Sequence, residues 1–244
     1  MEISEYRNIY QNEATHFFYV NTHGTVISFI KKYFTIKSRI KILDAGCGTG
    51  LLLKKISPFG QVYGVDNHQE AIALSRKRGL KNVRLASVSS LPFKPETFDL
   101  ITCIDVLYHK DISSDRKVLK EFYRVLKPGG VLILKNPAYD WLRGHHDSIV
   151  HTAHRYTKSE LNSKLQRAGF KIKKITYAYT FIFPFVLLKR VSGRFFKNSS
   201  SDVEEIPQFL NKLLLTLQTI ETRIILIFNL PFGLSIYSVC QKPR

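Results

Sequence analysis

Cysteine is scarce in this chain, and its few copies are far apart. The 244 residues include 3 cysteines, at positions 47, 103 and 240, in apolar or glycine-rich surroundings. Such spacings form neither a disulfide framework nor a zinc site. We therefore expect reduced thiols, the usual state in the cytoplasm, and no metal centre.

Leader sequences and long apolar runs are also missing. Residues 1–8 (MEISEYRN) lack the basic and then apolar pattern of a signal peptide. Two apolar segments, 181–191 and 210–230, are short or interrupted by polar and charged residues, whereas a spanning helix needs about 20 consecutive apolar residues. We expect neither to cross a membrane, and we expect a helical insertion that lies on the sheet or on a membrane surface.

Acidic residues are absent from one long stretch. The whole chain has 37 basic and 19 acidic residues, a formal charge of +18, but residues 161–201 contain no acid. A solvated basic surface explains the overall charge, whereas a local run without acids indicates an anionic partner. That partner is either a membrane surface bound through 181–200 or nucleic acid bound through 161–200. The basic residues of the stretch are Lys164, Arg167, Lys171, Lys173, Lys174, Lys189, Arg190, Arg194 and Lys197.

The remaining pattern alternates between strand and helix. Apolar strand signals occur at 40–44, 61–66, 83–85, 98–104 and 131–134, with helical signals between them. This alternation predicts an α/β fold with a doubly wound, mostly parallel sheet and helices on both faces. Two later segments, 170–180 and 234–242, alternate apolar and polar residues like a sixth and a seventh strand. We expect seven strands in all, the last of them antiparallel.

Three parts follow from this organisation. Residues 1–38 are expected to form an N-terminal helical cap. Residues 39–180 and 231–244 are expected to form the core. Residues 181–230 are expected to be an apolar and basic helical insertion between the sixth and seventh strands.

A glycine turn joins the first strand to a helix. Residues 41–50 read KILDAGCGTG, with Asp44 two positions before the first of three glycines. Glycine is needed where a Cβ would block positive φ angles or the close approach of a ligand. A strand, a glycine turn and a helix together form the place where backbone meets a nucleotide-like ligand. Asp66, after the second strand, can accept hydrogen bonds from a ribose diol, although it could also be an ordinary turn or cap residue.

Four ordered motifs in this chain resemble those of the class I S-adenosylmethionine-dependent methyltransferases. They are LDAGCGTG (43–50), GVD (64–66), LPFKPETFDLI (91–101) and YRVLKPGG (123–130). The glycine spacing also differs from the G-x-G-x-x-G of dinucleotide-binding turns. The resemblance implies a Rossmann-like fold and S-adenosylmethionine as the methyl donor.

The resemblance also assigns cofactor-binding residues. Asp44 and Gly46 are expected beside the amino-acid part of the cofactor. Gly48 and Gly50 are expected to shape the turn, and Asp66 to hold the ribose.

Three more residues belong to this expected cofactor site. The family usually has an acid where this chain has Ser87, and that acid bonds the adenine amino group. The Ser87 hydroxyl can accept the same bond without charge assistance, and we expect it to bind adenine together with the Val88 backbone. Asp105, just after the fourth strand, is expected at the methionine end of the cofactor or at the acceptor.

Two histidines are the candidate catalytic residues. In methyl transfer from a sulfonium, the protein aligns the nucleophile and removes its proton. His109 lies four residues after Asp105 and is of the type that serves as a base near neutral pH. The alternative is a structural loop histidine. His151 is the second candidate, for deprotonating or orienting the acceptor.

His151 belongs to a loop that resembles one subfamily of these enzymes. The subfamily pattern is "hD….H.rRYt", and its counterparts here are Asp147, His151, Arg155, Tyr156 and Thr157. We expect a polar lid in which Asp147 orients His151 and Arg155 pairs with an acid. The alternative is a metal site built from His145, His146, Asp147, His151 and His154.

Three functions remain open at this point. The first is an S-adenosylmethionine-dependent methyltransferase that acts, at oxygen, on a small or lipid-linked acceptor. It would use a histidine base and would be cytoplasmic and peripheral at an anionic membrane. The second is an RNA methyltransferase, whose basic stretch and interleaved aromatic residues would track phosphates and stack on bases. The third is a non-catalytic module that binds an adenosine cofactor.

Overall fold

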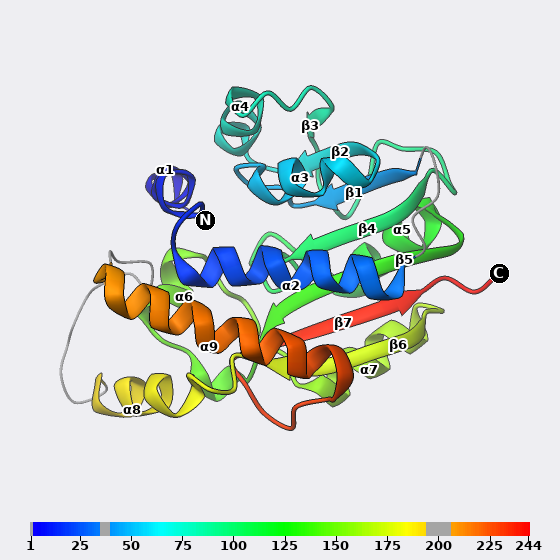
Figure 1. Cartoon of the computed structure of the whole chain (residues 1–244). Coiled ribbons are helices and arrows are strands. Elements are labelled where there is room, and N and C mark those ends of the chain that lie inside the picture. Colours follow the sequence, from blue (N-terminus) through cyan, green and yellow to red (C-terminus); the bar gives the residue numbers. More distant parts are fainter. Residues whose placement is uncertain (1, 35–39, 194–205) are drawn as a thin grey trace.

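The computed structural model describes residues 2–34, 40–193 and 206–244, with the backbone alone at 145–146 and 189–193. Its centre is one seven-stranded sheet with the order β3-β2-β1-β4-β5-β7-β6 (Figure 1). Strand β7 is antiparallel to both of its neighbours, and the other pairs are parallel. The predicted fold class is therefore confirmed. The strands are β1 (Lys41–Ala45), β2 (Gln61–Asp66), β3 (Val83–Leu85), β4 (Phe98–Ile104), β5 (Leu126–Pro137), β6 (Lys171–Ala178) and β7 (Ser235–Gln241).

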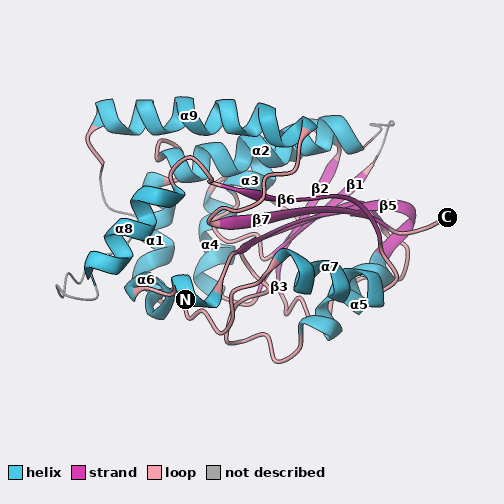
Figure 2. Cartoon of the chain, turned by 90° about the horizontal axis from the view of Figure 1, so that it is seen from below, coloured by secondary structure: helices cyan, strands magenta, loops and turns pink. Residues whose placement is uncertain are grey.

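Helices cover both faces of the sheet, as Figure 2 shows. Helices α5 and α7 pack on one face through residues such as Phe122 and Leu161. Helices α2, α3 and α9 pack on the other through residues such as Phe29, Leu53 and Ile225. The helices are α1 (Ile3–Asn12), α2 (Phe17–Tyr33), α3 (Leu51–Ile56), α4 (Gln69–Lys77), α5 (Asp115–Val125), α6 (His145–Ile149), α7 (Lys158–Arg167), α8 (Phe183–Gly193) and α9 (Gln208–Ile227).

Strand β5 is longer than its sequence pattern predicts. The apolar run suggests residues 131–134, but the strand begins at Leu126, directly after α5. A Cβ on Gly130 would meet the carbonyl oxygen of Lys127 at 2.8 Å. Residues 127–130 form a bulge between the pairs Phe98–Leu126 and Leu100–Val131, and Gly129 has a φ of 80°. The helix ends before Pro128 because proline cannot continue it.

Helices from two distant parts of the chain lie side by side on one face. Helix α2 follows α1 near the N-terminus, and α9 precedes β7 (Figure 1). Thr222 on α9 bonds Asn21 and Thr25 on α2, at 3.1 and 2.8 Å. Asn211 accepts the backbone N–H of Phe17 at 2.8 Å. The predicted cap and the predicted insertion thus share one helical layer.

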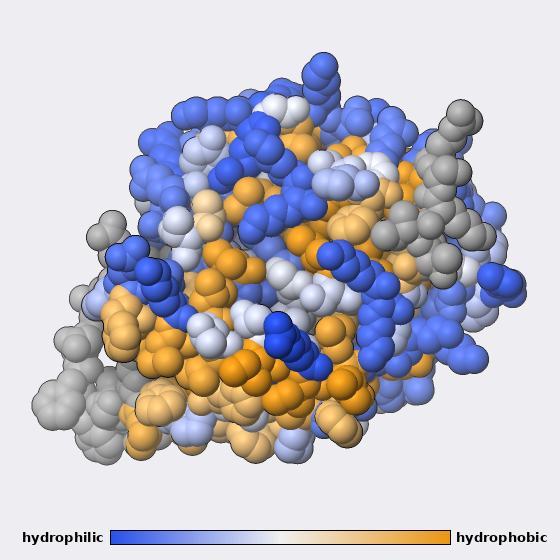
Figure 3. Space-filling model, in the orientation of Figure 1, coloured by the Kyte–Doolittle hydropathy of each residue, from blue (hydrophilic) through white to orange (hydrophobic). Residues whose placement is uncertain are grey.

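Helices α8 and α9 expose many apolar side chains. Phe185 and Leu188 on α8 are 71% and 67% exposed, and Phe209 on α9 is 81% exposed. Figure 3 shows an apolar surface in the region where Figure 1 places α9. Within the described residues, no helix has the length and apolar content needed to span a membrane. Part of the predicted basic stretch, including Arg194 and Lys197, lies outside the described residues.

Candidate active site

The predicted site residues gather along one edge of the sheet. Asp66 ends β2, the glycine turn follows β1, and Asp105 follows β4. In sheet order these three strands are adjacent. Ligands of open parallel sheets bind at this carboxyl edge. The fold therefore brings the sequence motifs into one crevice.

The three glycines of the turn meet different surroundings. All have positive φ angles, of 81°, 52° and 84° for Gly46, Gly48 and Gly50. A Cβ on Gly46 would stand 2.2 Å from a methyl carbon of Val106, and one on Gly50 would stand 2.6 Å from Leu80. A Cβ on Gly48 would meet no atom within 4 Å. The turn is thus close-packed behind and open above Gly48, as a cradle for a nucleotide-like cofactor requires.

Two buried carboxyl groups flank the turn. Asp44 is 2% exposed and accepts a hydrogen bond from the Thr102 hydroxyl at 2.7 Å. Burial raises the pKa of Asp44 to about 7. Asp66 accepts the backbone N–H groups of Gly48 and His68, at 2.9 and 3.0 Å, and burial raises its pKa as well. Asp66 therefore fixes the turn, and a carboxylate retains further acceptor positions for a ribose.

The N-terminal helix reaches the same crevice, which the sequence did not indicate. The ring of Tyr6 on α1 stacks on His68 at 4.7 Å, and burial and the charge of Asp66 raise the pKa of Tyr6. Glu13, just after α1, pairs with Arg78 and accepts the hydroxyl of Thr49. Contacts over such long separations leave no local pattern in the sequence. Helix α1 closes the crevice on the β2 side.

Ser87 and Val88 lie after β3, next to the end of β2. The N–H of Ala86 donates to the carbonyl of Asp66 at 2.9 Å, which places the following residues beside the ribose-side acid. Ser87 is exposed and accepts the N–H of Ser89 at 3.2 Å, while Val88 is buried. This position suits an adenine contact, and the role stays a prediction.

Asp105 is joined to Lys135, a residue that sequence reasoning missed. Its backbone φ is 57°, an unusual value for a residue other than glycine. The ammonium of Lys135 lies 2.5 Å from the Asp105 carboxylate, and it also lies 4.4 Å from the centre of the Phe18 ring. Burial lowers the pKa of Lys135. The only sequence signal is one lysine inside the apolar run of β5.

The two candidate histidines come together at the end of the post-β4 loop. The ring centres of His109 and His151 are 6.0 Å apart, and His109 forms an antiparallel bridge with Thr152. His109 Nδ1 lies 3.5 Å from Asp111. Burial is the main cause that lowers the pKa of His109 to about 4. The imidazole is therefore neutral near pH 7, and its catalytic role stays a prediction.

The loop after β5 contains an ion-paired network. Arg155 donates to both carboxylate oxygens of Asp147, at 2.8 and 3.0 Å, and both side chains are buried. His154 lies between Asp140 and Glu160, at 2.7 and 2.9 Å. Among the described side chains, no group of three metal-ligating residues is present. The side chains of His145 and His146 fall outside that description.

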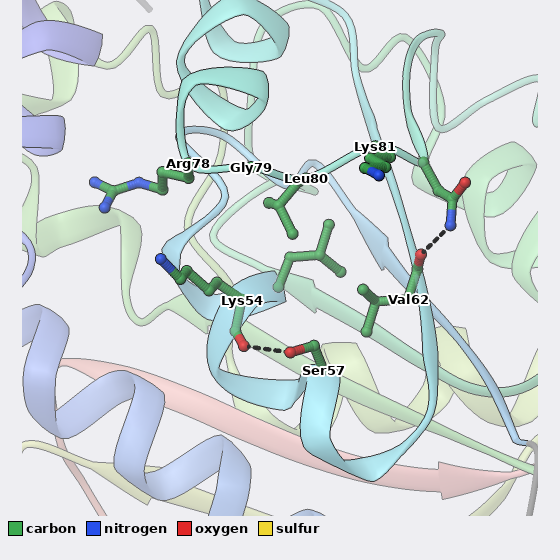
Figure 4. Close-up of a pocket in the computed structure, with 9 residues that line it drawn as sticks. Lys54, Ser57, Val62, Arg78, Gly79, Leu80 and Lys81 are labelled. Carbon is green, nitrogen blue, oxygen red and sulfur yellow. Dashed lines mark hydrogen bonds between the residues drawn. The ribbon is translucent and has the colours of Figure 1, made fainter.

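A separate surface pocket of about 310 Å³ lies behind the glycine turn. Leu53 and Leu80 line it, and Figure 4 shows the side chain of Leu80 pointing into it while the guanidinium of Arg78 points away. That guanidinium is held by Glu13 and by the carbonyl oxygen of Thr49. None of the predicted site residues lines this pocket. We therefore place the functional site at the sheet edge.

Comparison with known proteins identifies a methyltransferase domain and the fold. Residues 43–134 match the model of the methyltransferase domain. The chain is 31% identical over 114 residues to the ubiquinone biosynthesis O-methyltransferase of Idiomarina loihiensis, covering 43% of this chain and 46% of that protein. It is 30% identical over 144 residues to the demethylmenaquinone methyltransferase of Geobacillus stearothermophilus, covering 51% and 59%. The chain thus spans about half the length of these curated relatives.

Two solved structures share the fold over most of this chain. Phosphoethanolamine N-methyltransferase 2 of Haemonchus contortus, in complex with S-adenosyl-L-methionine, superposes with a TM-score of 0.61 at 19% identity. The match covers 91% of this chain and 53% of that one. The [4+2]-cyclase SpnF superposes with a TM-score of 0.60 at 18% identity, covering 91% and 80%. The second name shows that the fold alone does not fix the reaction.

The domain match, the topology and the glycine turn agree on one class. Residues 43–134 match the methyltransferase domain family, and the sheet topology agrees with the Rossmann-like fold of S-adenosylmethionine-dependent methyltransferases. The cofactor of this family is S-adenosylmethionine, and the open cradle above Gly48, flanked by Asp44 and Asp66, fits it.

Proposed function

We propose that this protein is an active S-adenosylmethionine-dependent methyltransferase that acts on a small or lipid-linked acceptor at oxygen. The observation that carries this proposal is the open glycine cradle facing a loop that holds a neutral histidine. Asp66 and the turn would hold the ribose, Ser87 and Val88 the adenine, and Asp44 and Gly46 the amino-acid end. When bound, the cofactor supplies an electrophilic methyl group on a sulfonium.

His109 is the proposed base. Its ring is mostly shielded from water, with 18% of the side chain exposed, and it is neutral near pH 7. With the cofactor bound, the acceptor oxygen would receive its methyl group, and the imidazole of His109 would accept the proton that the hydroxyl loses. His151, within 6.0 Å, orients the same group. Neither histidine needs a metal for this role.

The acceptor class is supported by the relatives and by the surface. Two relatives have names from quinone biosynthesis, ubiquinone and demethylmenaquinone, and such quinones combine a ring with an apolar chain. The exposed apolar residues of α8 and α9 could accommodate a partner of that kind. The acid of α9, Glu221, is 2% exposed and accepts the backbone N–H of Phe181 at 3.0 Å. The described surface of these helices therefore presents apolar and basic groups without a carboxylate.

From this surface we infer that the protein is cytoplasmic and binds peripherally to an anionic membrane. The combined change Phe185→Ser, Leu188→Ser and Phe209→Ser is expected to weaken binding to phosphatidylserine vesicles about 10-fold or more, because each buried apolar side chain contributes about 1.5–3 kcal/mol. Sedimentation with the vesicles measures this. Leu85→Ser is the control, since Leu85 is 57% exposed on β3. Equal vesicle binding by the unchanged protein, the triple variant and Leu85→Ser would contradict the membrane proposal.

Methyl tracking tests the activity and the acceptor class together. With methyl-labelled S-adenosylmethionine and a bacterial extract, we expect label in the lipid or small-molecule fraction. Label in RNA, with binding that weakens steeply as salt rises, would favour the RNA alternative. Titration calorimetry is expected to show cofactor binding. Binding without any transfer would favour the non-catalytic module, and no binding at millimolar cofactor would contradict the proposal.

A further inference from the structure

Two Lys–Asp ion pairs join β4 to β5, one at each end of these strands. At the amino end, Lys127 lies 2.8 Å from Asp99, with side chains 40% and 24% exposed. At the carboxyl end, Lys135 lies 2.5 Å from Asp105, with side chains 1% and 26% exposed. The carboxylates are equally accessible, but the ammonium of Lys135 is fully buried.

Stability does not explain the buried ammonium. Removing a lysine from water costs several kcal/mol, which one ion pair barely offsets, and an apolar residue is often as good or better. The neighbours Ile133 and Leu134 are such residues, both fully buried. The remaining contacts of the Lys135 ammonium are with the rings of Phe18 and Tyr179, at 4.4 and 5.7 Å. Among the described residues, Asp105 is the one anionic partner of Lys135.

The ion pair fixes one half of the Asp105 carboxylate and leaves the other half facing the crevice. Oδ2 is held by Lys135, and the backbone N–H of Asp105 donates to the carbonyl oxygen of Lys135 at 2.9 Å. The backbone φ of Asp105 is 57°. Residues that carry a side chain adopt this conformation only at an energetic cost, and they do so mostly at functional sites. In the part of the chain that the structure describes, no group donates to Oδ1. The Asp105 carboxylate is thus already oriented before a methyl acceptor binds.

The position of Asp105 separates it from the adenosine end of the crevice. The ribose-side acid Asp66 lies on β2, and the glycine turn lies on β1, whereas Asp105 and Lys135 lie on β4 and β5. Val106, the next residue, contacts the back of Gly46. Along the sheet, Asp105 therefore lies on the side of the glycine turn opposite Asp66. Burial and, to a lesser degree, the charge of Asp105 raise the pKa values of Tyr19 and Tyr108.

We propose that Asp105 is an acceptor-binding catalytic residue, and that Lys135 is a positioning residue that acts through it. Oδ1 of Asp105 accepts a hydrogen bond from a second donor group of the methyl acceptor, beside the hydroxyl whose proton His109 accepts, and the ring or chain of the acceptor lies against Phe18. This inference rests on the proposed methyltransferase function. It moves Asp105 from the cofactor to the acceptor, and it restricts the acceptor to molecules with a second hydrogen-bond donor near the reacting hydroxyl.

The experiment compares the two ion pairs. Asp105→Asn and Lys135→Met are expected to lower methyl transfer into a bacterial lipid and small-molecule extract about 10- to 100-fold, the effect of losing one charge-assisted hydrogen bond. The affinity for S-adenosylmethionine, measured by calorimetry, is expected to stay within about threefold. Asp99→Asn and Lys127→Met are the matched controls at the other end of the strands, and both measurements should stay near the unchanged protein.

A double variant separates positioning from folding. Lys135→Met combined with Asp105→Asn removes both charges, so we expect a higher melting temperature than that of Lys135→Met alone while methyl transfer stays low. Recovery of transfer in the double variant would overturn the inference. Unchanged transfer by Asp105→Asn, or cofactor affinity that falls in step with transfer, would overturn it as well. Absence of transfer by the unchanged protein would overturn the proposed function instead, and the inference with it.

Discussion

Gly46→Ala is expected to lower the melting temperature strongly, whereas Gly48→Ala is expected to leave the protein folded and to abolish strong cofactor binding. The two glycines are two residues apart and both have positive φ angles. A Cβ on Gly46 would stand 2.2 Å from Val106 and must displace the loop after β4. Overpacking and φ strain together amount to about 3 kcal/mol, which corresponds to a fall of about 6–12 °C in a chain of this size.

The Gly48 variant has the opposite consequence, because its Cβ would enter open space. Only φ strain, about 1–2 kcal/mol, acts on the fold. The new methyl group, however, occupies the cradle where the cofactor backbone contacts would form, so the dissociation constant for S-adenosylmethionine should rise about 100-fold or more. Thermal melting and calorimetry measure the two effects.

A compensating change tests the physical cause at Gly46. Val106→Ala removes the methyl groups that the new Cβ would meet, so it should restore most of the lost stability when combined with Gly46→Ala. It should not restore cofactor binding to Gly48→Ala. Equal melting temperatures for the two single glycine variants would show that the turn is not packed as the structure has it.

The sequence was sufficient to predict the sheet and the edge of the sheet at which the site lies. The strands alternate with helices at short intervals, and the glycine turn has a spacing that allows few other structures, so β1 to β4 were predicted within about one residue. Strand β5 was predicted too short because the turn residues Pro128 and Gly129 look like a break in sequence. In the structure they form a bulge within the strand, which pairs with β4 on both sides of it, at Leu126 and at Val131.

The long-range parts of the site could not be predicted. Nothing near Glu13 in the sequence indicates that it meets Thr49 and Arg78, because these contacts arise from the packing of α1 on the core. Likewise, the sequence of β5 is an apolar strand pattern with one lysine. This pattern does not determine whether the Lys135 side chain lies on either face of the sheet or extends to solvent. Its burial depends on Phe18 from α2 and on Tyr179 after β6, and each is placed by the buried α9 contacts. Such arrangements are tertiary and have no local pattern.

His109→Gln is expected to lower the rate of methyl transfer about 100-fold or more, as for the loss of a general base, while leaving cofactor affinity nearly unchanged. Burial lowers the pKa of His109 to about 4, and the nearby Asp111 opposes this effect. The neutral, proton-accepting form therefore dominates above about pH 4. The transfer rate should fall on the acid side near pH 4 rather than near the usual 6.5 of histidine, and it should fall as the pH decreases.

The pH profile also separates His109 from the other titrating group of the crevice. Burial raises the pKa of Asp44 to about 7, so any step near neutral pH belongs to the cofactor side and should remain in His109→Gln. The step near pH 4 should disappear in that variant.

The stability of the protein must be followed in parallel. The His109 imidazole binds a proton below about pH 6.5 in the unfolded chain, but only below about pH 4 in the folded protein. Acid therefore weakens the fold between these two pH values. His154→Gln serves as the control, since its partners Asp140 and Glu160 belong to the loop network. An unchanged rate and profile in His109→Gln would assign the proton to another group, with His151 the next to test.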